Sequence, residues 1–394
     1  MVRRVVSITG SRADYGLMEP IHRAIAIDSA FDLHLVITGM HFLPEFATGL
    51  AQVRGDKFGT LHEVPLPLDK DSSAAMAQSV GYAIIGVANI LAQLRPDIVL
   101  LQGDRGEMLA GAIVAAHMNI PIVHMSGGDF SGSIDDSVRN AISKLAHIHL
   151  TNCDASTRRL VALGEVSARI VEVGEPGLDQ LRTMDFLPID QLTAELDLPR
   201  DKPFLIATLH PVTDEVAAAK KQMTTLLEAL AETRMVTVFT YPNSDAGGRA
   251  MRDVLESWRS RSFLRIDPNL GSRRYLSLLR HAAAIVGNSS SGIYDSPTLK
   301  IPVVNIGSRQ MGRMRANNVV DVDSDKQAIV DAIRFVLNDS VFRAALADCR
   351  NPFGDGHAAE RTIDVLRRLR LGPDLIVKWR PFSGQFLTAP GDDV

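Results

Sequence analysis

Short, mostly apolar runs alternate with amphipathic segments along most of the chain. In the first half, the runs that predict strands are 4–9, 32–38, 97–101, 121–125, 147–151 and 169–173. In the second half, they are 203–209, 235–241, 263–266, 283–287 and 302–306. Runs that stay apolar throughout are typical of parallel strands covered on both faces by helices. The pattern therefore predicts an α/β fold built from doubly wound, Rossmann-like sheets.

Segments of helical period separate these strands. The predicted helices are 17–28, 72–94, 154–163, 188–196, 213–233, 247–259, 272–280, 324–337, 340–348 and 357–370. Between the second strand and the helix 72–94, the piece from Gly39 to about Leu61 has no clear period and is predicted to be irregular. An irregular piece of that length in a compact domain is usually functional or mobile.

A chain of 394 residues is long enough for two domains. The regular alternation of predicted strands and helices is interrupted over 174–203, and we place the linker between the two domains there. We expect an N-terminal Rossmann-like domain over 1–176 and a C-terminal one over 177–356, facing each other across a central cleft. After them we expect a helix over 357–371 that packs back on the N-terminal domain, and an unassigned tail over 372–394.

Composition narrows the class of protein. Hydrophobic residues make up 46% and charged residues 22%, as in soluble globular proteins. A net charge of −4 argues against a dedicated nucleic-acid binder. Cys153 and Cys349 are the only cysteines, which favours a reducing compartment. With no signal peptide and no run of about 18 apolar residues found, we expect a cytoplasmic protein with no membrane or nucleic-acid partner.

Acidic residues and arginines follow two neighbouring predicted strands. The strand 97–101 leads into Asp104 and Arg105, and the strand 121–125 leads into a Gly-rich loop that carries Asp129, Asp135, Asp136 and Arg139. Ligands bind at the carboxyl ends of strands in open α/β sheets. Several carboxylates converging there are costly unless chemistry or a cation uses them.

A metal cluster is the rival explanation for these acids. Magnesium sites use one or two carboxylates together with phosphates, so the residue types fit. Arg105 and Arg139 adjoin the acids, however, and would repel a cation, and we expect both to contact the substrate. We therefore favour acid–base chemistry on a neutral sugar, with neither a metal nor a cofactor.

Two loops in the second half suit phosphates. The first opens a helix after the strand 283–287 and holds Ser289, Ser290, Ser291 and Gly292, with Asp295 one turn further. Hydroxyls and free amides at a helix start bind anions, although an ordinary helix cap needs only one serine. The second loop carries Arg309, Arg313 and Arg315 among glycines, and guanidinium groups suit phosphates and carboxylates.

The histidines indicate less about function than the acids and the two loops do. His210 follows a predicted strand and is a candidate acid, base or diphosphate contact, but a hydrogen-bonded strand-end histidine is nearly as plausible. For His117, His124, His147 and His149 we favour structural roles, since no third metal ligand accompanies the alternating pair 147 and 149.

Together these pieces resemble the hydrolysing UDP-N-acetylglucosamine 2-epimerases. The resemblance runs in order over residues 3 to 370, and its motifs are TGSRADYG (9–16), TGMHFLPEF (38–46), RPDIVLLQGDRGEMLAGA (95–112), GSIDDSVRNAISKLAHIH (132–149), VGEPGLD (173–179), HPVT (210–213), GNSSSGIYDSP (287–297), GSRQMGRMRA (307–316) and NPFGDGHAAE (351–360). The resemblance implies the GT-B arrangement, with UDP held mainly by the C-terminal domain. We also expect a homo-oligomer, a dimer or a tetramer.

The chemistry that the resemblance implies needs no metal and no nicotinamide. A base removes the proton at C2 while UDP leaves from C1, which gives a 2-acetamidoglucal. Water then adds and the free 2-epimer is released. The expected reaction converts UDP-N-acetylglucosamine and water into N-acetylmannosamine and UDP, as in sialic-acid biosynthesis.

Site residues carry over by position. Asp104 and Asp135 match catalytic acids of the family, and His210 matches its cleft histidine. The matches to its nucleotide or phosphate contacts are Arg12, Ser289, Ser290 and Arg309, while Asp295 stands where the family generally has a ribose-binding Glu.

Ser126 is the main departure from the family pattern. Sialic-acid-type members have an acidic residue at that position, and Asp129, three residues on, could supply the carboxylate instead. Asn140 also replaces a usual His. These changes keep three alternatives open: the same chemistry on a UDP-2,4-diacetamido-2,4,6-trideoxyhexose, a GT-B glycosyltransferase, and a nucleotide-sugar-binding protein that has lost catalysis.

Overall fold

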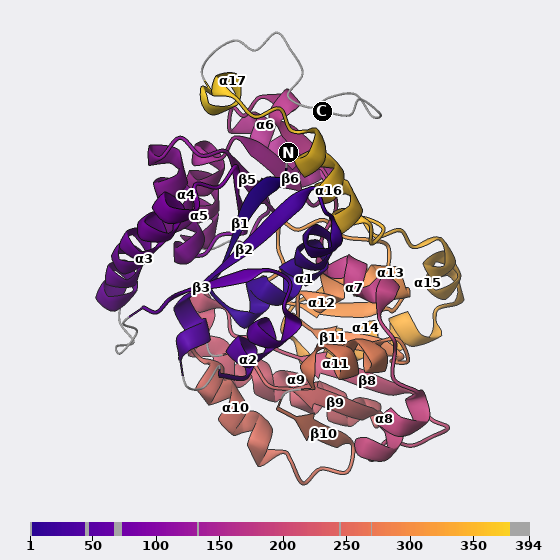
Figure 1. Ribbon diagram of the computed structural model, residues 1–394. Coiled ribbons are helices and arrows are strands. Elements are labelled where there is room, and N and C mark those ends of the chain that lie inside the picture. Colours follow the sequence, from indigo (N-terminus) through magenta and orange to yellow (C-terminus); the bar gives the residue numbers. More distant parts are fainter. Residues whose placement is uncertain are drawn as a thin grey trace. The chain divides into compact units, whose positions relative to one another are not determined.

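The computed structural model describes residues 2–43, 47–66, 73–131, 134–243, 246–268 and 270–378. The chain divides into two compact units (Figure 1). Unit 1 is Met1–Gln180 together with Phe353–Val394, and unit 2 is Leu181–Pro352. The chain therefore enters unit 2 after Gln180 and returns to unit 1 at Phe353.

Unit 1 is built on a seven-stranded sheet in the order β3-β2-β1-β4-β5-β6-β7, with every neighbouring pair parallel. The strands are β1 (Arg3–Thr9), β2 (Phe31–Thr38), β3 (Thr60–Val64), β4 (Ile98–Gln102), β5 (Ile122–Met125), β6 (Ile148–Thr151) and β7 (Ile170–Glu172). Strand order reverses between β1 and β4, which makes their carboxyl ends the switch point where such sheets bind ligands.

Helices cover both faces of this sheet. They are α1 (Arg12–Ile27), η1 (Gly39–Phe42), α2 (Ala47–Asp56), α3 (Ser73–Leu94), α4 (Gly106–His117), α5 (Ile134–Leu145), α6 (Asp154–Ala162), η3 (Ser167–Arg169), α7 (Gly177–Thr183), α16 (Ala358–Arg368) and α17 (Pro373–Ile376). Figure 1 shows α1 and α16 on one face of the sheet and α3, α4 and α5 on the other. One apolar cluster joins the sheet to α1 and α16, and another joins it to α3, α4 and α5. The strands β1, β2, β4, β5 and β6 are mostly buried, which explains their apolar runs.

Unit 2 repeats the same architecture with six parallel strands in the order β10-β9-β8-β11-β12-β13. The strands are β8 (Phe204–Thr208), β9 (Val236–Thr240), β10 (Leu264–Asp267), β11 (Ala284–Gly287), β12 (Val303–Ile306) and β13 (Val319–Val322). Its helices are α8 (Ile189–Glu195), η4 (Thr213–Ala218), α9 (Ala219–Thr233), α10 (Gly248–Ser257), α11 (Gly271–Leu279), α12 (Ser291–Tyr294), α13 (Ser296–Leu299), α14 (Lys326–Asn338), α15 (Ser340–Ala345) and η5 (Leu346–Asp348). The α/β class with two doubly wound, Rossmann-like sheets is confirmed.

Three local expectations were wrong. The piece from Gly39 to Leu61 contains η1, α2 and the start of β3; α2 has few apolar residues and β3 is a short edge strand, so neither shows a strong period. The strand β13 was missed because it is short and carries Asp321. Finally, Asp135, Asp136 and Arg139 lie on helix α5 and not in a loop.

Helix α3 corrects the expectation that no long apolar run exists. Among the described residues, the helix Ala74–Leu94 is long enough and apolar enough to cross a membrane, judged by length and composition alone. Of its most apolar stretch, 28% is buried. Three of its side chains, Ala83, Val87 and Leu91, are nevertheless fully buried in the core of unit 1. These contacts are those of a covering helix on a sheet.

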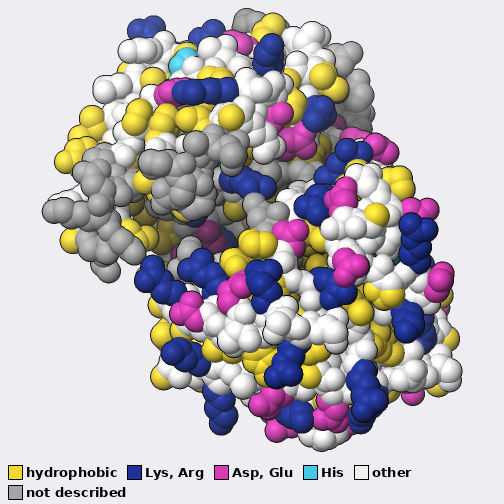
Figure 2. All heavy atoms as spheres, turned by 90° about the horizontal axis from the view of Figure 1, so that it is seen from below, with side chains coloured by type: hydrophobic (Ala, Val, Ile, Leu, Met, Phe, Trp, Pro, Cys, Tyr) yellow, Lys and Arg dark blue, Asp and Glu magenta, His cyan; other side chains and the backbone are white. Residues whose placement is uncertain are grey.

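Charged side chains of both signs are mixed on the surface. On the face drawn in Figure 2, Lys and Arg side chains lie among Asp and Glu side chains, without a broad area of a single sign among the described residues. This mixture agrees with the small net charge of −4.

Candidate active site

The carboxyl ends of β4 and β5 bring the sequence-predicted acids of unit 1 together. After β4, Gly103 takes a positive φ of +73° and turns the chain into Asp104. After β5, the chain reaches Asp129 and then α5, whose first turn carries Asp135 and Asp136. Carboxylates are favoured at a helix N-terminus. We call Asp104, Asp129, Asp135, Asp136 and Arg139 the acid edge.

Arg139 lies at the centre of the acid edge and is only 4% exposed. Its Nη2 donates to Asp104 Oδ2. Its Nη1 donates to Asp136 Oδ1 at 2.6 Å and to the Asp129 carbonyl at 2.8 Å. The side chain expected to contact substrate therefore binds the acids and holds them in place.

The pKa of Asp104 is shifted in the direction that suits proton transfer. Burial raises the pKa of Asp104, the Arg139 charge opposes this, and the charges of Asp135 and Asp129 raise it further. A carboxyl group whose pKa moves toward neutrality can exchange a proton with a substrate more readily. Asp104 and its neighbours thus form a set of acids in unequal environments.

Ser126 forms an uncharged pair beside these acids. Its Oγ accepts from Gln102 Nε2 at 3.2 Å, and both residues are 6% exposed. Ser126 has a φ of +61°, which is uncommon for a residue with a side chain. The position where the resemblance expects an acid is therefore occupied by a neutral, hydrogen-bonded hydroxyl.

A second polar cluster at the switch point was not identified from the sequence. Asp14 accepts from Ser11 Oγ at 2.8 Å and from Thr9 Oγ1, and burial raises the pKa of Asp14 to about 6. Thr9 also bonds to His41 Nε2 at 2.9 Å. The Ser-x-x-Asp spacing of 11–14 is a capping box and could have indicated this arrangement. The cluster fixes the start of α1, whose first residue is the candidate Arg12.

Glu107 is a further acidic residue at the switch point. It lies in the first turn of α4, and Arg105 Nε donates to its Oε2 at 3.3 Å. A Cβ added at Gly39 would meet Glu107 Oε1 at 2.2 Å. The candidate Arg105 is thus held beside a carboxylate that packs over the turn after β2.

In unit 2, His210 is held as a neutral imidazole. Its Nδ1 accepts from the Asn243 backbone N–H at 3.0 Å, and burial together with the Arg309 charge lowers the pKa of His210 to about 3. The proton therefore sits on Nε2, which is available as a donor. This geometry favours a neutral hydrogen-bond contact over a general base.

Asn288 organises the two expected phosphate loops. Its Oδ1 accepts from the His210 backbone N–H at 2.7 Å. Its carbonyl accepts from Arg309 Nη1 at 3.0 Å and from Gln310 Nε2 at 2.8 Å. Arg313 donates to Gln310 Oε1 at 2.6 Å. Asn288 therefore links the serine loop (288–292) to the arginine loop (307–315) through hydrogen bonds.

The serine loop owes its shape to Gly287. This residue has a φ of +134°, and a Cβ there would meet the Thr208 carbonyl oxygen at 1.9 Å. Ser289 and Ser290 follow, and Ser291 opens α12 with Gly292 buried behind it. Because α12 is four residues long, its dipole is small, and an anion here would rely on hydroxyls, amides and arginines.

Asp295 lies at the end of α12. Burial raises the pKa of Asp295 to about 6, against a hydrogen bond with Ser291. Among the described residues, no three His, Cys, Asp or Glu side chains form a group that could hold a metal ion.

Comparisons with known proteins identify the family of the chain. A family model described as UDP-N-acetylglucosamine 2-epimerase matches residues 23–367. A UDP-N,N'-diacetylbacillosamine 2-epimerase (hydrolyzing) of Legionella pneumophila is 35% identical over 96% of this chain and 99% of its own length. A UDP-N-acetylglucosamine 2-epimerase of Neisseria meningitidis is 31% identical over 87% of this chain and 90% of its own.

Solved structures show the same fold. The crystal structure of the UDP-GlcNAc 2-epimerase from Neisseria meningitidis, bound to UDP-GlcNAc, superposes with a TM-score of 0.79 at 18% identity. The match covers 92% of this chain and 99% of that one. Since the family model matches most of the chain and relatives above 30% identity span nearly all of it, the protein belongs to the UDP-N-acetylglucosamine 2-epimerase family.

Proposed function

We propose that the protein is a hydrolysing UDP-sugar 2-epimerase. The observation that carries the proposal is the acid edge, where Asp104 has a raised pKa beside Asp135 and is bonded to the buried Arg139. Acids in unequal environments suit a reaction that needs one group to accept a proton and another to donate one.

The reaction has two balanced steps. In the first, a carboxylate takes the proton from C2 and the C2 electron pair forms the C1–C2 double bond, while UDP leaves from C1 with the electrons of its bond. In the second, water adds its hydroxyl to C1 and a proton reaches C2 from the opposite face. We assign the proton transfers to Asp104 and Asp135, with Asp129 as the third acid.

Unit 2 is proposed to bind the UDP. Arg309 and Arg313 suit the diphosphate, together with the hydroxyls and amides of Ser289, Ser290, Ser291 and Gly292. His210 can donate its Nε2 proton to a phosphate oxygen, in keeping with its neutral state. In unit 1, Arg12 and Arg105 are further candidates for anion contact.

A 2,4-diacetamido sugar is the substrate that we favour. The relative with 35% identity is described as acting on UDP-N,N'-diacetylbacillosamine. The neutral Gln102–Ser126 pair supports the same choice, because a hydroxyl and an amide can hydrogen-bond an added acetamido group without placing a charge beside it. UDP-N-acetylglucosamine, giving N-acetylmannosamine, is the second candidate, supported by the Neisseria relative at 31% identity.

A substrate panel in D₂O tests the reaction. The protein is incubated with UDP-N-acetylglucosamine, with the UDP-2,4-diacetamido-2,4,6-trideoxyhexose and with their GDP-linked counterparts. We expect UDP release, a free 2-epimer and one deuterium at C2, with the diacetamido substrate turned over faster. Release without deuterium at C2 contradicts proton removal there.

Other outcomes of the same panel separate the alternatives. A UDP-linked 2-epimer formed without UDP release identifies the non-hydrolysing reaction. Sugar transfer to an added acceptor, with no free hexosamine, identifies a glycosyltransferase. Tight binding of the nucleotide sugar with no turnover identifies a binding protein.

The pH dependence of nucleotide binding tests Asp295. If its carboxylate accepts hydrogen bonds from the ribose, affinity needs the ionised form, which is complete above a pKa of about 6 and lost below it. At pH 5 about a tenth of the group is ionised, so we expect UDP to bind up to about tenfold more weakly than at pH 7.5. Calorimetry on the wild type and on Asp295→Asn measures this.

Comparison with Asp295→Asn isolates the contribution of the Asp295 carboxyl group to UDP affinity. The terminal phosphate of UDP itself titrates in this range, but it does so equally for both proteins. The affinity ratio of wild type to Asp295→Asn should therefore fall as the pH drops from 7.5 to 5. A constant ratio argues against a ribose contact by Asp295.

A further inference from the structure

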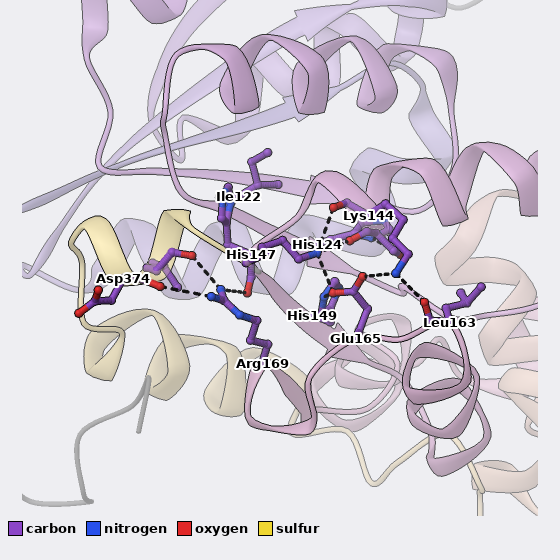
Figure 3. A network of polar contacts seen from close by, with 12 residues as sticks. Ile122, His124, Lys144, His147, His149, Leu163, Glu165, Arg169 and Asp374 are labelled. Carbon is purple, nitrogen blue, oxygen red and sulfur yellow. Dashed lines mark hydrogen bonds and ion pairs between the residues drawn. The ribbon is translucent and has the colours of Figure 1, made fainter. Parts of the chain in front are cut away.

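The last described residues of the chain are tied to the sheet of unit 1. The segment Pro373–Lys378 lies beyond residue 367, where the family match ends. Arg169, 1% exposed, donates to the carbonyls of Leu375 at 2.8 Å, His147 at 3.0 Å and Asp374 at 3.3 Å. Figure 3 shows the Arg169 guanidinium reaching toward Asp374 and His147. The segment is therefore a fixed part of unit 1.

Lys378 reaches from this segment to the C-terminal end of α5. Its Nζ donates to the carbonyls of Ser143 at 3.2 Å and Lys144 at 3.0 Å. These carbonyls belong to the last turn of α5, where backbone acceptors lack helical partners and a cation is favoured. Lys378 thus holds α5 at the end opposite to Asp135 and Asp136.

Glu165 fixes the position of Lys378. Its side chain is 2% exposed and contacts Lys378 at 2.7 Å, His149 at 3.0 Å and Lys144 at 3.0 Å. In Figure 3 its carboxylate lies between His149 and Lys144. A buried carboxylate with this many donors is well satisfied, so the ammonium of Lys378 has a defined place.

The same turn of α5 is joined to the Asp104 turn through His124. His124 is fully buried, and its Nε2 bonds to the Gly103 carbonyl at 2.8 Å. A carbonyl can only accept, so Nε2 carries the proton and Nδ1 accepts from Ser143 Oγ at 3.1 Å. Ser143 therefore contacts His124 with its hydroxyl and Lys378 with its carbonyl.

We propose that Lys378 is a positioning residue for the acid edge. It sets the placement of α5, so that Arg139 meets Asp104 while His124 holds the turn that carries Asp104. The connection runs from Lys378 through Ser143 to His124 and Gly103. The catalytic consequence rests on the proposed function, whereas the structural connection stands by itself.

The test compares Lys378→Met with two controls. Lys378→Arg keeps the charge and should therefore keep kcat near the wild-type value. Arg367→Met removes the ion pair of α16 with Asp28, a tie near the C-terminus that does not involve α5. For Lys378→Met we expect kcat to fall about tenfold with KM within about twofold, because small misplacements of reacting groups cost rate more than binding. Lys378→Arg and Arg367→Met should stay near wild type.

Amide hydrogen exchange gives a readout that does not depend on turnover. Lys378→Met should exchange faster over residues 102–106 and 134–145, with β1 and β2 unchanged. Unchanged exchange over 102–106 overturns the proposal, as does an equal loss of kcat in Arg367→Met. If the wild type turns over no nucleotide sugar, the proposed function fails, while the exchange experiment still decides the connection.

Discussion

Asp104→Asn is expected to lower kcat by about 10²–10⁴-fold, the range for loss of a positioned acid or base. The amide keeps the shape of the side chain but cannot take up or release the proton. Since Asp104 is bonded to Arg139 and the nucleotide is proposed to bind in unit 2, KM should change little. Steady-state kinetics of UDP release with the substrate that the panel identifies measures both constants.

Asp136→Asn is the matched control. Asp136 also bonds to Arg139, and Ser131 N–H donates to it at 2.9 Å, but it is not assigned a proton transfer. If Asp104 mattered only as a partner of Arg139, the two variants would lose activity equally. A normal kcat for Asp104→Asn would contradict the assignment of a proton transfer to Asp104.

The pH profile adds a second readout. Burial raises the pKa of Asp104, so its titration should appear in the wild-type profile of kcat above the range of an ordinary aspartate. That limb should disappear from the residual activity of Asp104→Asn. A limb that persists belongs to another group.

Much of the fold could be predicted because parallel strands buried on both faces leave an unmistakable pattern. The runs that became β1, β4 and β8 are mostly apolar and mostly buried, and each is followed by a helical period. Elements at the sheet edges carry less of this signal. β3 and β13 are short and half exposed, so their residues alternate with polar ones and the period is weak.

Candidate site residues could be proposed from the sequence, but their contacts could not. The strand ends identified Asp104 and Asp129, since residues that follow parallel strands gather at one edge. The burial of Arg139 could not be foreseen, because α5 was not recognised behind its Gly-rich start. Lys378 lies far from Glu165 and Ser143 in sequence, and no local pattern indicates such a contact.

Arg139→Met is expected to give the largest loss of stability, about 3–5 kcal/mol, as for other buried ion pairs that lose one partner. Arg139 has 5% of its side chain exposed, whereas Asp104 and Asp136 keep 25% and 21%. Water can therefore reach the two carboxylates in part, and we expect the lower end of that range, about 3 kcal/mol. The physical cause is two carboxylates left partly buried without their cation.

The loss should depend on pH in a defined direction. Burial already raises the pKa of Asp104, and without the opposing charge of Arg139 it rises further above the unfolded value near 3.9. The folded state then binds protons more tightly than the unfolded state, so the destabilisation is full above the raised pKa and fades as the pH falls toward the unfolded one. The loss should be larger at pH 8 than at pH 5.

Because two units can unfold separately, one free energy for the whole chain is not well defined. Amide exchange of the most protected residues of β1 and β4 reports the unfolding of unit 1 itself. Arg158→Met is the control, since Arg158 pairs with Asp154 on α6 with 69% and 60% of the side chains exposed. Its loss should stay below about 1 kcal/mol.

A double variant decides whether unpaired charge is the cause. Arg139→Met with Asp136→Asn removes one of the stranded carboxylates, so it should be more stable than Arg139→Met alone. Residues that share one network are non-additive in this way. Losses that simply add, or a loss in Arg139→Met that is the same at pH 5 and pH 8, would mean that Arg139 stabilises unit 1 by packing and not by balancing the acids.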